Sequence, residues 1–120
     1  MTGTVLVVDN HELVRAVVSL FLARNGYSVA AAGTDAQAVD ALSWHQPAVV
    51  IANVEMLTDD GVLVDRLRRG NPNVPVVLMA DSRREWPIAG VPCLVKPFNV
   101  GLLLDTVVKL VGAPAFAVGD

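Results

Sequence analysis

The sequence is poor in cysteine, in aromatic residues and in basic charge, and these shortages exclude several classes of protein. Cys93 is the single cysteine, so no disulfide can form within the chain, which fits the reducing cytoplasm where we expect the protein to work. Nine Lys and Arg against twelve Asp and Glu give a net charge of −3, which argues against nucleic-acid binding by this domain. No apolar run reaches the roughly 18 residues that span a bilayer, so we expect no membrane segment.

Apolar residues, in contrast, are abundant. The chain is 53% hydrophobic, mainly through Val, Ala and Leu, which is enough for the core of one domain of 120 residues. This aliphatic composition favours parallel strands covered by helices over an antiparallel sandwich. We expect one domain over residues 1–112 and a flexible tail over residues 113–120.

Five short apolar runs alternate with segments of helical periodicity. The expected strands cover residues 4–8, 27–32, 48–53, 74–80 and 92–95. The expected helices follow the first, second, third and fifth of these strands, near residues 13–24, 35–45, 60–70 and 102–110. Regular alternation of strand and helix predicts an α/β fold with a parallel sheet and helices on both faces.

Local signals refine the helices. Thr34 followed by Gln37 is a capping-box signature, and Asn25-Gly26 is a helix stop. The apolar residues of the first helix that recur at helical spacing are Leu13, Val14, Val17, Val18, Phe21 and Leu22, with Arg15, Ser19 and Arg24 elsewhere on the helix. The crossover from Asp81 to Gly90 is short, and Pro87 would interrupt a helix there. We therefore predict a shortened or degraded fourth helix.

Polar residues follow several of the predicted strands. In a parallel α/β sheet every strand ends at the same edge, where binding sites form. The strand ends collect Asp9 and Asn10, Asn53, Ala80, and Lys96. This convergence is the main site hypothesis.

Other candidates are weaker. Glu55, Asp59 and Asp60 follow the third strand and suit loop solvation and helix capping better than chemistry. His11 and His45 stand far apart without nearby ligands at metal spacing, so we expect no zinc site.

The chain resembles the receiver domain of two-component response regulators over roughly residues 4–112. The resemblance rests on Val5-Leu6-Val7-Val8-Asp9-Asn10, Gly26-Tyr27, Met56, Asp60-Gly61, Pro75-Val76-Val77 and Lys96-Pro97-Phe98. It implies a flavodoxin-like fold with strand order 2-1-3-4-5. It also makes the bond before Pro97 a candidate for the cis form.

The resemblance also implies roles that several residues of this chain do not match. Asn53 stands where working receivers carry the phosphoaccepting aspartate, and Asp9 and Asn10 stand where two acids hold Mg²⁺. Ala80 replaces the hydroxyl residue that contacts the phosphoryl group, and Cys93 replaces the aromatic residue that moves on activation. Lys96 keeps its expected identity.

These replacements predict that phosphorylation is lost. A carboxamide is a poor nucleophile, and Mg²⁺ prefers charged oxygen ligands. We therefore expect no enzymatic activity, no cofactor and weak or absent Mg²⁺ binding. We predict that Lys96 pairs with Asp9 and donates to the amide oxygen of Asn53, so that the former pocket becomes a structural polar cluster.

The leading functional hypothesis is a phosphorylation-independent receiver in phosphorelay signalling that binds a protein partner. The partner would be a signalling protein, an output domain or a second copy, and would meet the last helix and the crossover at residues 81–90. Two alternatives are a phosphoaccepting receiver that uses a displaced acid, such as Asp9 or Glu55, and a small-ligand sensor that uses the vacated pocket.

Overall fold

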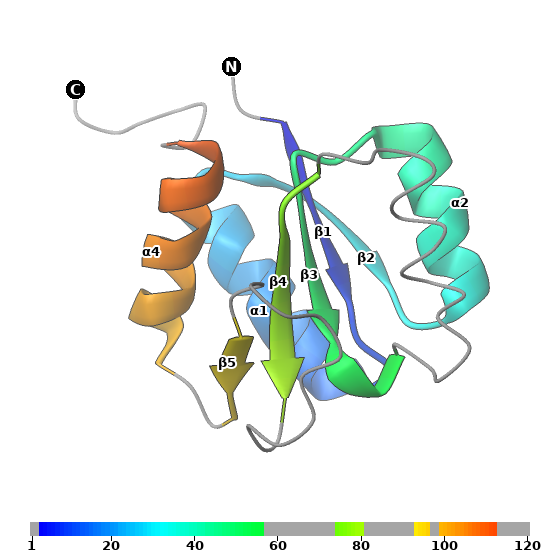
Figure 1. Ribbon diagram of the computed structural model, residues 1–120, viewed down its shortest axis with the longest axis horizontal. Helices are drawn as coiled ribbons and strands as arrows, with labels where there is room; N and C mark the ends of the chain where they lie inside the picture. The colour runs from blue at the N-terminus through cyan, green and yellow to red at the C-terminus, as the bar shows by residue number, and fades with distance from the viewer. Residues whose placement is uncertain (1–2, 57–73, 81–92, 97–98, 113–120) are drawn as a thin grey trace.

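A computed structural model describes residues 3–56, 74–80, 93–96 and 99–112 of the chain (Figure 1). Its elements in chain order are β1 (Thr4–Val8), α1 (Glu12–Arg24), β2 (Ser28–Ala32), α2 (Asp35–His45), β3 (Val49–Asn53), the 3₁₀ turn η1 (Val54–Met56), β4 (Val76–Ala80), β5 (Cys93–Val95) and α4 (Val100–Val111). None of the helices in these ranges has the length and apolarity needed to cross a membrane.

The five strands form one parallel sheet in the order β2-β1-β3-β4-β5. This confirms the α/β, flavodoxin-like architecture and the strand order 2-1-3-4-5. The order places β1 and β3 side by side in the middle, with Val8 level with Ala52. Asp9 comes directly after Val8 and Asn53 directly after Ala52, so both lie at the same edge of the sheet.

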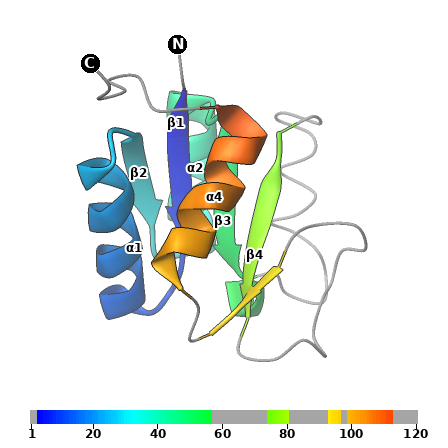
Figure 2. The same ribbon diagram turned by 90° about the vertical axis from the view of Figure 1, so that its left-hand side faces the viewer.

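Helices cover both faces of the sheet. Figure 2 shows α1 and α4 on one side and α2 on the other. Because successive side chains of a strand point to opposite faces, Val5 and Val7 of β1 join the core under α1 and α4, whereas Leu6 and Val8 join the core under α2. Strands buried on both faces account for the continuous apolar runs in the sequence.

The caps of the helices follow the sequence signals. Thr34 precedes α2, and its hydroxyl oxygen accepts a hydrogen bond from the amide of Gln37 at 3.1 Å. The Gln37 side chain reaches back to the amide of Gly33 at 2.8 Å, which completes a variant of the predicted capping box. Asn25 and Gly26 end α1, and Gly26 has a φ of 97°, the left-handed conformation that glycine adopts readily.

The apolar face predicted for α1 is partly wrong. Val18 and Leu22 are buried and Val14 and Phe21 pack against the same core, but Leu13 and Val17 are largely exposed. The apolar positions predicted for this helix span a wider arc than the sheet covers. A single helix packed on a sheet buries only one side, so part of a wide apolar arc stays outside.

The far end of α4 is tied to the start of β2. Tyr27 is buried, and its hydroxyl donates to the carbonyl oxygen of Gly112 at 2.9 Å. Burial raises the pKa of this phenol. The bond joins residues 85 positions apart and fixes the C-terminal end of α4 against the sheet.

Several predictions fall outside the described residues. These are the helix near residues 60–70, the shortened crossover at residues 81–90, the cis form of the bond before Pro97 and the flexible tail at residues 113–120.

Candidate functional site

Two polar side chains are buried in the described part of the chain, and they touch each other. Asp9 is fully buried after β1, and Asn53 is 2% exposed at the end of β3. The Nδ2 of Asn53 donates to Oδ1 of Asp9 at 3.1 Å. The pairing of β1 with β3 brings these residues, 44 positions apart, into contact.

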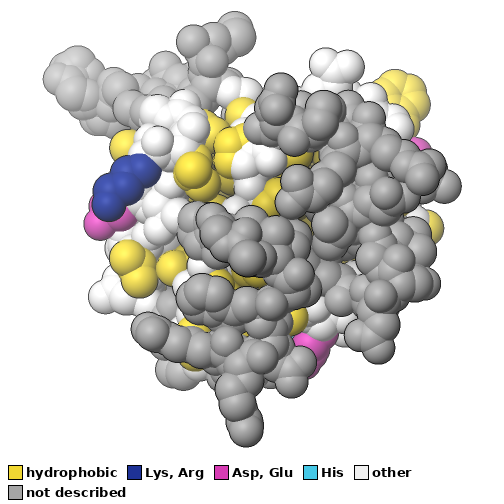
Figure 3. Space-filling view, viewed as in Figure 1, with side chains coloured by type: hydrophobic (Ala, Val, Ile, Leu, Met, Phe, Trp, Pro, Cys, Tyr) yellow, Lys and Arg dark blue, Asp and Glu magenta, His cyan; other side chains and the backbone are white. Residues whose placement is uncertain are grey.

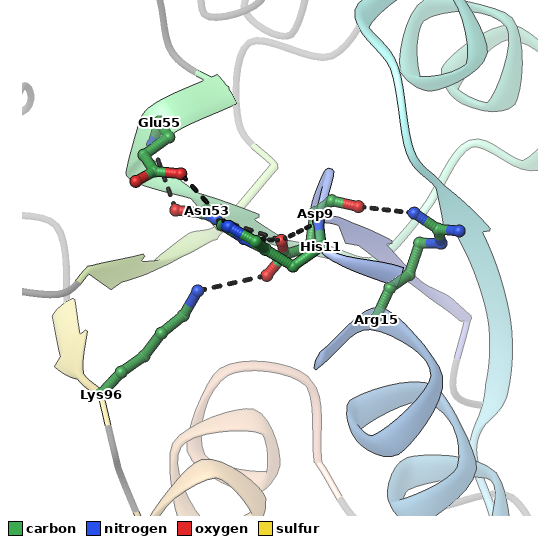
Figure 4. Close-up of polar contacts among 6 residues, drawn as sticks. All are labelled: Asp9, His11, Arg15, Asn53, Glu55 and Lys96. Carbon is green, nitrogen blue, oxygen red and sulfur yellow. Dashed lines mark hydrogen bonds and ion pairs between the residues drawn. The ribbon is translucent and has the colours of Figure 1, made fainter. Parts of the chain in front are cut away.

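Lys96 completes the predicted cluster from the end of β5. Its Nζ lies 3.4 Å from Oδ2 of Asp9, and its side chain is only 15% exposed (Figure 4). The predicted ion pair with Asp9 is therefore confirmed. The predicted bond from Lys96 to the amide oxygen of Asn53 is wrong: the Lys96 ammonium contacts Asp9, and the Asn53 oxygen accepts from the backbone amide of Glu55 at 3.1 Å.

His11 belongs to the same cluster, a role that was not predicted from the sequence, where it stood only as a rejected zinc ligand. Its backbone amide donates to Oδ1 of Asp9 at 2.8 Å, and its Nδ1 lies 3.1 Å from the same oxygen. Nδ1 also lies 3.2 Å from Nδ2 of Asn53, and Nε2 lies 3.7 Å from Oε1 of Glu55. Its place two residues after Asp9, just before the first helix, was the signal that could have found it.

The tautomer of the His11 ring decides which of these contacts is a hydrogen bond. A ring with a proton on Nδ1 donates to Asp9, whereas a ring without it accepts from Asn53. Both forms join the end of β1 to the end of β3.

Arg15 supports Asp9 from the opposite side. Its Nη1 donates to the backbone carbonyl oxygen of Asp9 at 2.9 Å, and Figure 4 shows its side chain reaching back from α1. A Cβ at Gly33 would overlap the Arg15 guanidinium, so the glycine leaves room for this contact. Arg15 thus fixes the backbone that carries the central carboxylate.

The environment of Asp9 favours its charged form. Burial alone raises the pKa of the Asp9 carboxyl, but hydrogen bonds from the His11 amide and from Asn53, the charge of Lys96 and the His11 side chain together outweigh it. The pKa of Asp9 is therefore held below its ordinary value. The cluster is a satisfied ionic centre, since both carboxylate oxygens have donors.

The other predicted site residues lie around this centre with smaller parts in it. Ala80 is buried at the end of β4, and its carbonyl oxygen accepts from the amide of Lys96 at 2.7 Å. Cys93 is half-buried in β5 and packs against the core under α2. Asn10 is exposed in the loop after β1, and the Glu55 side chain is about half exposed.

The capacity of the cluster for a cation rests on few acidic groups. Among the residues that the structure describes, Asp9 is its one buried carboxylate, and Glu55 is a half-exposed one nearby. Within the described residues, no group of three or more His, Cys, Asp or Glu side chains is placed to hold a metal ion.

Comparison with known proteins relates this geometry to one family. The family model of the response regulator receiver domain matches residues 5–108. The chain is 33% identical over 104 residues to the probable transcriptional regulatory protein TcrX of Mycobacterium tuberculosis, which covers 81% of this chain and 44% of TcrX. It is 28% identical over 119 residues to the DNA-binding transcriptional regulator NtrC of a Bradyrhizobium strain, which covers 93% of this chain and 25% of NtrC.

A solved structure agrees with the same assignment. The chemotaxis response regulator CheY4 of Vibrio cholerae superposes with a TM-score of 0.79 and 26% identity, covering 92% of this chain and 100% of CheY4. The chain spans less than half the length of the two curated relatives.

Proposed function

This chain belongs to the response regulator receiver domain family of two-component signalling, and we propose that it acts there without accepting a phosphoryl group, through contact with a protein partner. The partner class is a signalling protein or an output domain, which meets the surface formed by the last helix, α4.

The side-chain amide of Asn53 carries this proposal. The resemblance puts a phosphoaccepting aspartate at this position, but a carboxamide is neutral and a poor nucleophile. Here both ends of the amide are also engaged, since Nδ2 donates to Asp9 and Oδ1 accepts from the amide of Glu55. The group is 2% exposed, so an incoming phosphoryl donor would have to break these bonds to reach it.

The surroundings of Asn53 support the same proposal. Phosphoryl transfer depends on charge neutralisation by metal and cation together. Asp9 is the one acid left of the pair expected to hold Mg²⁺, and its two oxygens already accept from protein donors, with the Lys96 ammonium 3.4 Å away. Ala80 offers no hydroxyl at the position where the family contacts the phosphoryl group.

Incubation with acetyl phosphate and Mg²⁺, followed by intact-protein mass spectrometry, tests the proposal. We expect no stoichiometric gain of a phosphoryl group, while a receiver with aspartate at this position gains one under the same conditions. A stoichiometric gain by this chain would overturn the proposal.

Glu55 supplies the alternative. Its carboxylate is about half exposed beside the cluster and could act as a displaced acceptor. Beryllofluoride with Mg²⁺ mimics the phosphorylated state, so NMR shift changes around residues 53–56 that disappear in Glu55→Gln would favour this candidate. An unchanged spectrum in the wild type would remove it.

A further inference from the structure

The outward side of α1 is apolar along most of its length. Leu13, Val17 and Leu20 are 76%, 51% and 54% exposed. Ala16 and Ala23 are exposed on the same helix. These five residues, Leu13, Ala16, Val17, Leu20 and Ala23, form what we call the outer stripe.

The other helix on this side of the sheet is different. α4 also exposes large apolar side chains, Leu102 by 52% and Val100, Val108 and Leu110 by 36–38%, but the exposed charged residues Asp105 and Lys109 interrupt them. Figure 3 shows basic and acidic side chains side by side with hydrophobic ones where α4 lies in Figure 1. On α1 the exposed charges stand only at the two ends, Glu12 in the first turn and Arg24 in the last. The third charge, Arg15, is turned toward Asp9.

The outer stripe is complementary to itself. In a two-fold interface residue i of one copy meets residue j of the other, and j meets i. When two copies of α1 lie antiparallel around residue 18, Leu13 meets Ala23 and Leu20 meets Ala16, so each leucine of the stripe faces an alanine. The same register brings Glu12 near Arg24, which adds opposite charges at both ends of the helix pair.

We propose that α1 is a self-association surface, on which the outer stripe of one copy packs antiparallel against the outer stripe of a second copy. This register favours a second copy over an unrelated helix. The same two-fold axis, at the level of residue 18, pairs leucine with alanine and Glu12 with Arg24. A standard stable interface buries about 800 Å² per partner, and three turns of one helix offer less. The dimer is therefore weak and forms at high protein concentration. This proposal is independent of the proposed function.

Analytical ultracentrifugation over a concentration series tests the surface. Leu20→Lys is compared with Leu102→Lys, a matched control because the two leucines are 54% and 52% exposed. We expect the wild type to associate reversibly, Leu20→Lys to raise the dimer Kd at least about tenfold, and Leu102→Lys to leave it unchanged. A wild type that stays monomeric at millimolar concentration, or an equal loss in both variants, would overturn the proposal.

Charge exchange tests the register. Glu12→Arg and Arg24→Glu should each weaken association, and the double variant should restore it. Failure of the double variant to recover, after both single variants have lost association, would rule out the antiparallel register around residue 18.

Cross-linking tests the same register independently. With Cys93 replaced by Ser, a mixture of Leu13→Cys and Ala23→Cys chains should form a mixed disulfide. Each variant alone should not, because equivalent residues lie about 15 Å apart along the helix axes. Homodisulfides in place of the mixed product would exclude this arrangement.

Discussion

Most proteins bury apolar side chains and expose polar ones. The polar cluster at the strand ends and the outer stripe of α1 both depart from this rule, the first by burying polar groups and the second by exposing apolar ones. The cluster places Asp9, Asn53 and Lys96 largely out of solvent, whereas the stripe places Leu13 and Leu20 mostly in it. Inside, each polar group of Asp9 and Asn53 has a partner from the same chain. Outside, the apolar side chains are left exposed.

This difference separates contacts that stabilise the folded chain from contacts that stabilise only a complex with a second chain. Burying an ion pair gives little net stability over an apolar core, yet removing one partner is costly because the other charge stays behind. Exposed leucines cost the monomer little and contribute free energy only when a second surface covers them. The cluster should therefore respond to mutation through folding, and the stripe through association.

Asp9→Ala should have the largest effect on folding. It leaves the Lys96 ammonium, 15% exposed, without its carboxylate and removes the acceptor of Asn53. We expect a loss of about 3–5 kcal/mol in the free energy of unfolding, measured by urea denaturation. Glu55→Ala is the control, since the Glu55 side chain is about half exposed and, among the described residues, contacts His11 at 3.7 Å, and it should cost less than about 1 kcal/mol. Equal losses would mean that Asp9 is not the centre of the cluster.

Asn53→Asp should have the next largest effect. It replaces an N–H that donates to Asp9 with a second carboxylate at the same 3.1 Å distance. We expect a loss of about 1–3 kcal/mol at pH 7, which shrinks toward pH 4 as one carboxylate takes up a proton. Asn99→Asp is the control, because Asn99 caps α4 through its side-chain oxygen and Asp caps equally well. A stable Asn53→Asp variant with efficient acetyl phosphate labelling would show that Asn10 and Ala80 matter less than we propose.

Acid should weaken the cluster by a smaller amount. The pKa of Asp9 is lowered in the folded protein, so its stabilising contribution is present above the unfolded-state value of about 3.9. That contribution is lost as the pH falls through the lower folded-state pKa. Thermal unfolding between pH 6 and pH 2.5 should therefore show a steeper acid decline for the wild type than for Asp9→Asn. Parallel declines would assign the acid sensitivity to other carboxylates.

The smallest folding effect should come from the stripe. Leu20→Lys changes a side chain that is 54% exposed, so the monomer should keep its free energy of unfolding within about 0.5 kcal/mol. Urea denaturation at low protein concentration measures this. A loss above about 2 kcal/mol would mean that Leu20 belongs to the core of the monomer.

Much of the fold could be predicted because apolar run length and turn residues are local signals. β1 and β4 end at Val8 and Ala80, the last residues of their apolar runs, and β3 ends at Asn53, the polar residue that closes its run. The helix face of α1 could not be predicted as well. Leu13 and Val17 have the same apolar character as Val14 and Val18, and only packing against the sheet shows that the second pair contacts the core.

The sequence predicted which residues come together at the site. Asp9, Asn53 and Lys96 follow strands that a parallel sheet brings to one edge, and the structure joins them. His11 and Arg15 were missed because their roles depend on how the first turn of α1 folds back on Asp9. The place of His11 two residues after Asp9 was its one sequence signal, and it does not specify which contacts the side chain makes.

The sequence by itself determined the alternation of strands and helices, the identity of the groups at the sheet edge and the amide at position 53. These follow from local preferences and from the order of residues along the chain. Only the tertiary structure decided that Asn53 donates to Asp9 and accepts from the amide of Glu55, and that an apolar stripe of α1 faces outward. The physical reason is that hydrogen-bond direction and burial depend on neighbours distant in sequence.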